Sequence, residues 1–390
     1  MKRASLLLLL LACAGRQSID AIGNGADAGS GIDSAAPTEV VADGGVVPVS
    51  NCPASPFARA EVVACGLPAK SELFAVDTVG GPIHYWLIEP SGITRVDETG
   101  AWTRMVERPI GDPSSRDHTL GFSGGAILYS EDPGDCSSCV PGVRIFGARA
   151  SSAKTLGTVY TNLPLAQFVC EPDGACLYSD AGDDAAWALS TIGPAWSASS
   201  PNSISVALLR FSSFSALEWQ PVAIGGKGTW GIALSLYLLD DKLPGYTAYL
   251  VRQGQPPASP VNIGYIQSTA KLADLVARST FDDAAAYIPD DSSGTSTKIA
   301  RVPLSGPITY LPNTDGRWTR IRAIGSYLYG LRANALVRVD PKSLAETSVI
   351  ETVLTPLTNP GPVVGNGMAQ YITFDVTSNG TPTRVLAKLK

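Results

Sequence analysis

Three observations in the sequence predict an all-β fold built from repeated units. Hydrophobic residues make up 45% of the 390-residue chain and charged residues 16%, proportions that are typical of a folded protein. The 39 Gly and 29 Pro residues provide for many turns, which disfavours a helix bundle. Short apolar strands that end at an aromatic residue recur along the chain. This recurrence predicts a repeat architecture.

The aromatic residues that end these strands, which we call the aromatic anchors, lie 42 to 59 residues apart. They are Trp86, Tyr129, Tyr178, Tyr237, Tyr287, Tyr329 and Tyr371. Spacings of this size are typical of propeller blades. Several aromatic anchors precede a second apolar strand that contains an arginine, with turn residues in between, so each such unit contains a hairpin. We therefore expect a single β-propeller over residues 55–390, with seven blades.

One unit carries a resemblance to a known repeat. Residues 286–290 (AYIPD) and 298–306 (KIARVPLSG) resemble a YWTD repeat, and residues 128–132 (LYSED) match it more loosely. The rhythm of residues 57–390 is similar to that of YWTD and NHL β-propellers. This resemblance implies the fold and no particular ligand. YWTD propellers usually have six blades, so six is the alternative count.

The two ends of the propeller are expected to meet. Too few residues follow Tyr371 to supply the outer strand of a last blade. An open sheet edge would leave unpaired backbone groups, so the strand has to come from elsewhere in the chain. We expect residues 60–64 (AEVVA) to supply it and a Cys52–Cys65 disulfide to hold it.

The N-terminal residues are typical of an export signal. A positive start, Met1–Arg3, precedes the apolar run Leu6–Leu11, which is too short to span a bilayer. Residues 10–13 (LLAC) resemble the bacterial lipobox, in which the signal is cut before the cysteine and the thiol is lipidated. The resemblance implies a signal peptide over 1–12, lipid attachment at Cys13 and, since Ala14 is not Asp, an outer-membrane lipoprotein. A plain secretory signal, for a secreted or periplasmic protein, is the alternative.

Residues 13–54 predict a flexible, lipid-anchored linker, because small and polar residues dominate them without apolar periodicity. A Gly-rich coil of this length has a root-mean-square reach of about 35 Å. The propeller could therefore act a short distance from the membrane.

Six cysteines remain after Cys13, and they fall into three close pairs. The pairs are Cys52 with Cys65, Cys136 with Cys139, and Cys170 with Cys176. An even number in an exported chain favours disulfides, and local pairing would close short loops. The spacing of Cys136 and Cys139 also fits a redox motif or half a zinc site, but Asp135 and the following Val-Pro-Gly read as a loop.

Aspartates gather just after several aromatic anchors. They are Asp132, Asp180, Asp184, Asp240, Asp241, Asp290 and Asp291. If they occupy turns between second and third strands, they project from one face of the propeller. We interpret them as solvated turn residues, with a cation site, for example for Ca²⁺, as the alternative. None of them belongs to a complete calcium-loop motif, and we expect no other cofactor or metal.

Candidate catalytic motifs are few. Gly121–Gly125 matches the G-x-S-x-G motif of serine hydrolases, but a strand follows Ser123, and both histidines, His84 and His118, lie upstream. We therefore expect a tight turn. A nucleophile at Ser123 paired with His118, five residues earlier, is the alternative. Neither histidine has regular metal-ligand spacing, so structural roles are expected for both.

Arginines recur on the expected third strands: Arg95, Arg144, Arg301, Arg338 and Arg384. An anion-binding ring is one interpretation. Pairing with an acid on the neighbouring strand is the interpretation we favour.

A formal charge of −6 provides no basic field for nucleic acid. We expect an envelope lipoprotein whose propeller binds an envelope protein or glycan without catalysis. The alternatives are an envelope hydrolase or lyase with its site at the channel mouth, and a purely structural component. The shortage of histidine favours binding over catalysis.

Overall fold

The computed structural model describes part of the chain between residues 51 and 390. The described residues are 51–78, 81–90, 92–107, 120–123, 126–131, 142–147, 155–160, 168–170, 176–181, 187–192, 206–210, 219–226, 230–237, 245–252, 261–267, 275–276, 278–290, 298–311, 318–332, 335–343, 345–350, 355–365, 368–378 and 380–390. They all belong to one compact unit, Glu39–Lys390.

Within these residues the strands form seven antiparallel sheets of four strands each, one for each aromatic anchor. The inner strands are β2 (Glu72–Asp77), β6 (Leu120–Ser123), β10 (Phe168–Cys170), β14 (Trp219–Gly225), β18 (Thr280–Phe281), β22 (Trp318–Ile324) and β26 (Val364–Gly365). The second strands are β3 (His84–Glu89), β7 (Ala126–Glu131), β11 (Cys176–Ala181), β15 (Trp230–Tyr237), β19 (Ala285–Asp290), β23 (Tyr327–Arg332) and β27 (Gln370–Ser378).

The third strands are β4 (Gly92–Asp97), β8 (Gly142–Gly147), β12 (Trp187–Ile192), β16 (Gly245–Arg252), β20 (Lys298–Pro303), β24 (Ala335–Val339) and β28 (Thr381–Leu389). The outer strands are β5 (Trp102–Glu107), β9 (Thr155–Tyr160), β13 (Val206–Arg210), β17 (Val261–Gln267), β21 (Thr309–Leu311), β25 (Glu346–Ile350) and β1 (Ala60–Leu67). We number the sheets as blades 1 to 7, from β2–β5 to the sheet of β26, β27, β28 and β1.

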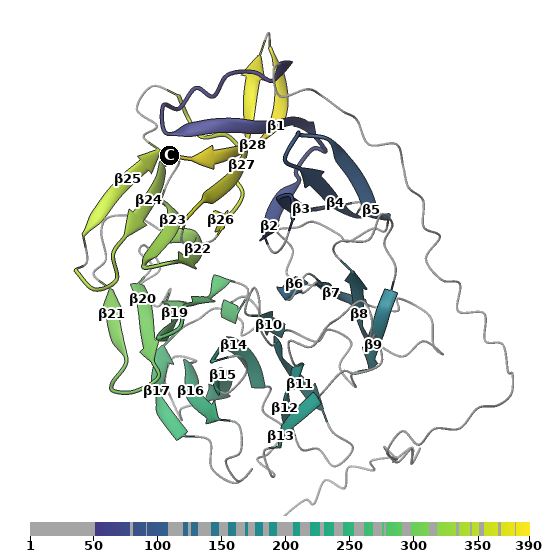
Figure 1. The fold of residues 1–390 in the computed structure, drawn as a ribbon. Helices are drawn as coiled ribbons and strands as arrows, with labels where there is room; N and C mark the ends of the chain where they lie inside the picture. The colour runs from purple at the N-terminus through teal and green to yellow at the C-terminus, as the bar shows by residue number, and fades with distance from the viewer. Residues whose placement is uncertain are drawn as a thin grey trace, which may run out of the picture. The chain divides into compact units, whose positions relative to one another are not determined.

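The blades follow one another around an axis that the inner strands surround (Figure 1). Inner strands of consecutive blades contact each other from β6 of blade 2 to β26 of blade 7, and β26 in turn contacts β2 of blade 1. Each blade has four alternating strands, so every inner strand begins at the same end of the axis. We call this the entry end. The connections between second and third strands lie at the same end.

The aromatic anchors all lie on second strands, as the repeat predicts. Alternate side chains on these strands face opposite neighbouring blades. Tyr287 packs with Trp318 and Leu328 of blade 6, whereas Ala286 and Ile288 pack with residues of blade 4. The core therefore consists of apolar layers between blades, and both faces of a blade are buried.

The chain ends close the ring. Strand β1 pairs antiparallel with β28, from Ala60 opposite Leu389 to Leu67 opposite Arg384. Apolar residues of blades 7 and 1 pack together, and the rings of Tyr85 and Tyr371 meet edge to face with centroids 4.9 Å apart. The expectation that residues 60–64 supply the missing outer strand is confirmed.

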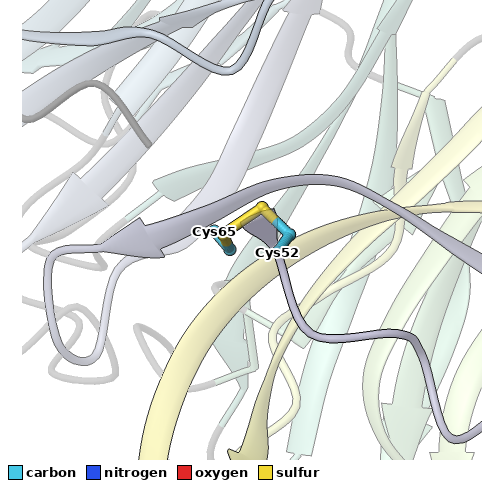
Figure 2. The surroundings of a disulfide bond; sticks show 2 residues. All are labelled: Cys52 and Cys65. Atoms are coloured by element: carbon cyan, nitrogen blue, oxygen red, sulfur yellow. A yellow bond between two sulfur atoms is a disulfide. The ribbon is translucent and has the colours of Figure 1, made fainter. Parts of the chain in front are cut away.

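A disulfide holds this outer strand. Cys65 on β1 bonds to Cys52 on the segment that precedes β1, as Figure 2 shows. The expected pairing of Cys52 with Cys65 is confirmed. The strand that closes the ring is thus held by backbone pairing on one side and by a covalent bond to its own leading segment.

Candidate binding site on the inner strands

Charged residues are rare on the inner strands. Along all seven inner strands as the structure bounds them, the charged residues are Glu72 and Asp77 on β2, and Arg320 and Arg322 on β22. A partly buried charge near the axis of a propeller destabilises the folded state unless it is paired with an opposite charge or binds a ligand. The four positions therefore mark the place where a candidate site is to be sought.

Arg320 reaches from blade 6 to blade 1. Its Nη1 lies 2.6 Å from Oε2 of Glu72, and their side chains are 31% and 15% exposed. The inner strand of the intervening blade 7, β26, has only two residues. The ion pair therefore links blades that are not neighbours in chain order, next to the closure of the ring.

The backbone at Arg320 is unusual. The register of β22 with β23 shifts between Thr319 and Arg322, so the strand carries a bulge there. Arg320 has φ 53°, in the left-handed region that non-glycine residues rarely adopt. Bulges and such strained residues are common near functional sites, where they redirect side chains.

Glu72, Arg320 and Arg322 form a charged cluster, and Arg322 is its least satisfied member. It donates a hydrogen bond of 2.8 Å from Nη1 to the main-chain oxygen of Ile321, and it forms no ion pair with a described carboxylate. Burial lowers the pKa of this half-buried guanidinium, and the nearby charge of Arg320 acts in the same direction, against the opposing effect of Glu72. Arginine nevertheless stays charged in proteins. The group is a cation in an unfavourable position.

Arg384 is fully engaged, in contrast to Arg322. Its guanidinium donates to the main-chain oxygens of Ser71 and Asn359, to Oγ1 of Thr373, and to Oδ1 of Asp375 at 3.1 Å. Burial lowers its pKa, and Asp375 counteracts this effect. Asp375 accepts a further bond of 2.6 Å from Nδ2 of Asn359. We interpret Arg384 as a structural residue that holds blade 7.

The arginines on the third strands follow a regular register with the second strands. Arg95, Arg144, Arg301 and Arg338 lie directly opposite the aromatic anchors Trp86, Tyr129, Tyr287 and Tyr329. Pairing with an acid on the neighbouring strand is confirmed for Arg384, which faces Asp375 and forms an ion pair with it. For the other four it stays a prediction. The pattern that repeats in sequence is a cross-strand pair of an aromatic residue and a cation.

The expected acidic face is placed only in part. Asp180 lies near the end of β11 and Asp290 ends β19, both second strands, so their backbone positions are at the entry end. Asp132, Asp184, Asp240, Asp241 and Asp291, together with the side chains of Asp180 and Asp290, lie outside the described residues. Their roles and the alternative Ca²⁺ site stay predictions.

Of the other two predicted cysteine pairs, one is confirmed. Cys170 and Cys176 form a disulfide that joins β10 to β11. Cys13, Cys136 and Cys139 lie outside the described residues.

The candidate catalytic residues are described only in part. Ser123 ends β6 in register with Ala126 of β7, so the G-x-S-x-G motif is a hairpin, as expected. His84 begins β3 at the end opposite the entry end, in register between Asp77 of β2 and Asp97 of β4. His118 lies outside the described residues.

In the part of the chain that the structure describes, no group of three or more His, Cys, Asp or Glu side chains is arranged to hold a metal ion. The same residues include no helix long and apolar enough to cross a membrane.

Sequence reasoning missed the cluster of Glu72, Arg320 and Arg322. A signal was present, since residues 318–324 (WTRIRAI) place two arginines in an otherwise mostly apolar strand. The partner Glu72 lies 248 residues away, and only ring closure brings it near.

Comparison with known proteins shows the fold. No protein-family model matches the chain. No curated protein matches it either. Among solved structures, it is similar to the β-propeller domain of the Trilobed protease from Pyrococcus furiosus, with 9% identity and a TM-score of 0.52 over 82% of this chain and 95% of that one. It is also similar to the Cps50 (Swd1) β-propeller domain of Myceliophteria thermophila, with 9% identity and a TM-score of 0.50 over 84% and 99% of the two chains.

A third similar structure is the acylaminoacyl peptidase of Pyrococcus horikoshii, with 8% identity and a TM-score of 0.51 over 82% of this chain. This chain spans about half of that enzyme, 52% of its length. The Pyrococcus furiosus domain is described as having an open velcro topology, whereas β1 and β28 close the ring here. At these identities the likeness concerns the fold alone, and it agrees with the strand topology: the chain folds as a β-propeller.

Proposed function

We propose that this chain is a cell-envelope lipoprotein whose β-propeller binds an envelope protein or glycan without catalysis. The envelope location is supported by the lipobox-like residues 10–13 and by the disulfides, which persist in oxidising compartments. In this proposal residues 1–12 are removed, Cys13 carries the lipid, and residues 13–54 tether the propeller to the outer membrane.

The observation that carries the binding proposal is the charged cluster at the inner strands. Arg320 is held by Glu72 in a strained backbone conformation, and Arg322 remains without a carboxylate partner among the described residues. Packing alone would favour apolar residues at these positions. Charges that fold stability does not explain are characteristic of sites that recognise a ligand.

Lipid attachment is tested by fractionation. We expect the full chain to float with membranes and a Cys13→Ala variant to be released from them, because more than one acyl chain gives stable anchoring. An Ala14→Asp variant is the matched control for sorting, and we expect it to stay membrane-bound while it moves from the outer to the inner membrane. Membrane binding of the Cys13→Ala variant would contradict the lipid anchor.

Partner binding is tested by capture from envelope extracts with the full chain. We expect one protein or glycan to be enriched and its recovery to fall with an Asp240→Asn/Asp241→Asn variant of the predicted acidic turns. No enrichment of any partner would count against a binding module. Turnover of an envelope peptide or glycan by the purified chain would favour the hydrolase or lyase alternative instead.

A further inference from the structure

Two arginines near the ring closure differ in how their charge is satisfied. Arg384 donates hydrogen bonds to four residues and pairs with Asp375. Arg322 donates one, to the carbonyl that precedes it in the chain. A guanidinium has five N–H donors in a planar fork, so most of the donors of Arg322 have no protein acceptor among the described residues.

The immediate surroundings of Arg322 do not neutralise it. Glu72 is engaged by Arg320 at 2.6 Å, so the three groups together carry one net positive charge. Arg320 lies within the bulge between Thr319 and Arg322 and reaches Glu72, whereas the described residues supply no carboxylate that pairs with Arg322. The chain thus keeps one guanidinium fork available beside a compensated ion pair.

We propose that Arg322 binds an oxyanion of a ligand, a carboxylate or phosphate group, through its guanidinium fork. A planar fork matches these groups with two parallel hydrogen bonds, and one monoanionic group would balance the charge of the cluster. The inference rests on the proposed binding function and names the chemical group that the propeller recognises. Arg320 acts as a positioning residue, because it engages the carboxylate of Glu72 in an ion pair.

The lowered pKa of Arg322 agrees with this role. Its cause is loss of water around the guanidinium, with repulsion from Arg320 added to it. A hydrogen bond to a charged group gains strength where water is excluded. An oxyanion would relieve both effects.

Calorimetric titration of the purified full-length chain tests the proposal, with inorganic phosphate and acetate as separate probes and sodium chloride at matched ionic strength. We expect saturable binding of at least one probe by the wild type. We expect Arg322→Gln to weaken that binding tenfold or more, because the variant loses charge-assisted hydrogen bonds to the oxyanion. Arg322→Lys retains the charge but not the fork, and it should bind with intermediate affinity.

Arg59→Gln is the control for net charge. Arg59 is exposed and donates to the main-chain oxygen of Ser348, so its removal should leave affinity unchanged. A preference for phosphate or for acetate identifies which oxyanion the site takes. Equal binding by wild type and Arg322→Gln, or no saturable binding of either probe by the wild type, overturns the inference. Partner capture from extracts is a separate measurement, so failure there with intact anion binding would reject the proposed function alone.

Discussion

Arg384 on the last strand binds the main-chain oxygen of Ser71, 313 residues earlier, through Nε at 2.8 Å and Nη2 at 2.5 Å. Ser71 directly precedes β2, the inner strand of blade 1. The contact therefore joins the last blade to the first from inside, while the pairing of β1 with β28 joins them from outside. Ring closure depends on both.

Replacing Arg384 with Met should strongly destabilise the protein. The variant leaves Asp375 without its cation and the oxygen of Ser71 without its donors, in a place where the arginine side chain is 3% exposed. Removing one partner of a buried ion pair lowers the free energy of unfolding by about 3–5 kcal/mol. Urea unfolding should show this as a lower midpoint.

The control for this prediction is Lys390→Gln. Lys390 pairs with Glu61 on the surface, with both side chains more than half exposed. Exposed pairs contribute little, so the unfolding midpoint should stay close to the wild type. An equal decrease of the unfolding midpoint in the two variants would show that Arg384 has no special part in ring closure.

Removing the Cys52–Cys65 disulfide should cost about 3 kcal/mol of unfolding free energy. The bond closes a loop with a sequence separation of 13 and ties β1 to its leading segment. A Cys52→Ala/Cys65→Ala variant should still fold, because β1 keeps its backbone pairing with β28. Calorimetry should show a lower Tm with one cooperative transition, and an unchanged Tm would contradict a stabilising role.

Deleting residues 55–66 should have a larger effect than losing the disulfide. The deletion removes most of β1 and the ring of Phe57, which packs on Phe374 with centroids 5.4 Å apart. It also exposes the edge of β28, and an unpaired edge invites aggregation. Thermal unfolding and light scattering would measure both effects. Unchanged thermal unfolding of the deletion variant would refute closure by β1.

The sequence predicts the blades well because their signal is local. An aromatic anchor on a second strand and a cation opposite it on the third lie within one hairpin, as Tyr287 and Arg301 do. Closure by β1 could also be predicted, because the edge of β28 would otherwise have unpaired backbone groups. Both features can be predicted from the geometry of a hairpin and from the number of strands that each blade requires.

The candidate site could not be predicted in the same way. Glu72 and Arg320 meet only after the ring has closed, and inner strands as short as β18 and β26 have no periodicity to recognise. The aspartates after the aromatic anchors can be recognised in the sequence, because they lie close together along the chain. The residues of the cluster on the inner strands, Glu72, Arg320 and Arg322, come from distant parts of the sequence and are neighbours only in the folded protein.

Replacing Arg322 with Gln should leave the anion-free protein as stable as the wild type or more stable, by up to about 2 kcal/mol. The change removes a desolvated charge and its repulsion with Arg320, and it gives up one hydrogen bond to the oxygen of Ile321. Urea unfolding in chloride buffer measures this directly. A loss as large as that of Arg384→Met would identify Arg322 as a structural residue instead.

Unfolding should become easier as the pH rises above about 10, the ordinary pKa of tyrosine. Burial raises the pKa of Tyr85, which lies against Tyr371, and burial together with the Asp282 carboxylate raises the pKa of Tyr287. The hydroxyl of Tyr287 donates to Oδ2 of Asp282 at 2.8 Å, a bond that needs the proton. Above pH 10 the unfolded chain releases these protons while the folded chain retains them.

Stability is therefore complete below the unfolded pKa and is lost with rising pH, by about 1.4 kcal/mol per pH unit for each such group. Urea midpoints between pH 8 and 11 should fall in the wild type, and the slope should be shallower in Tyr287→Phe. That variant loses the bond to Asp282 at every pH, so its slope, not its midpoint, is the informative quantity. Parallel slopes in the two proteins would exclude Tyr287 as a source of the alkaline loss.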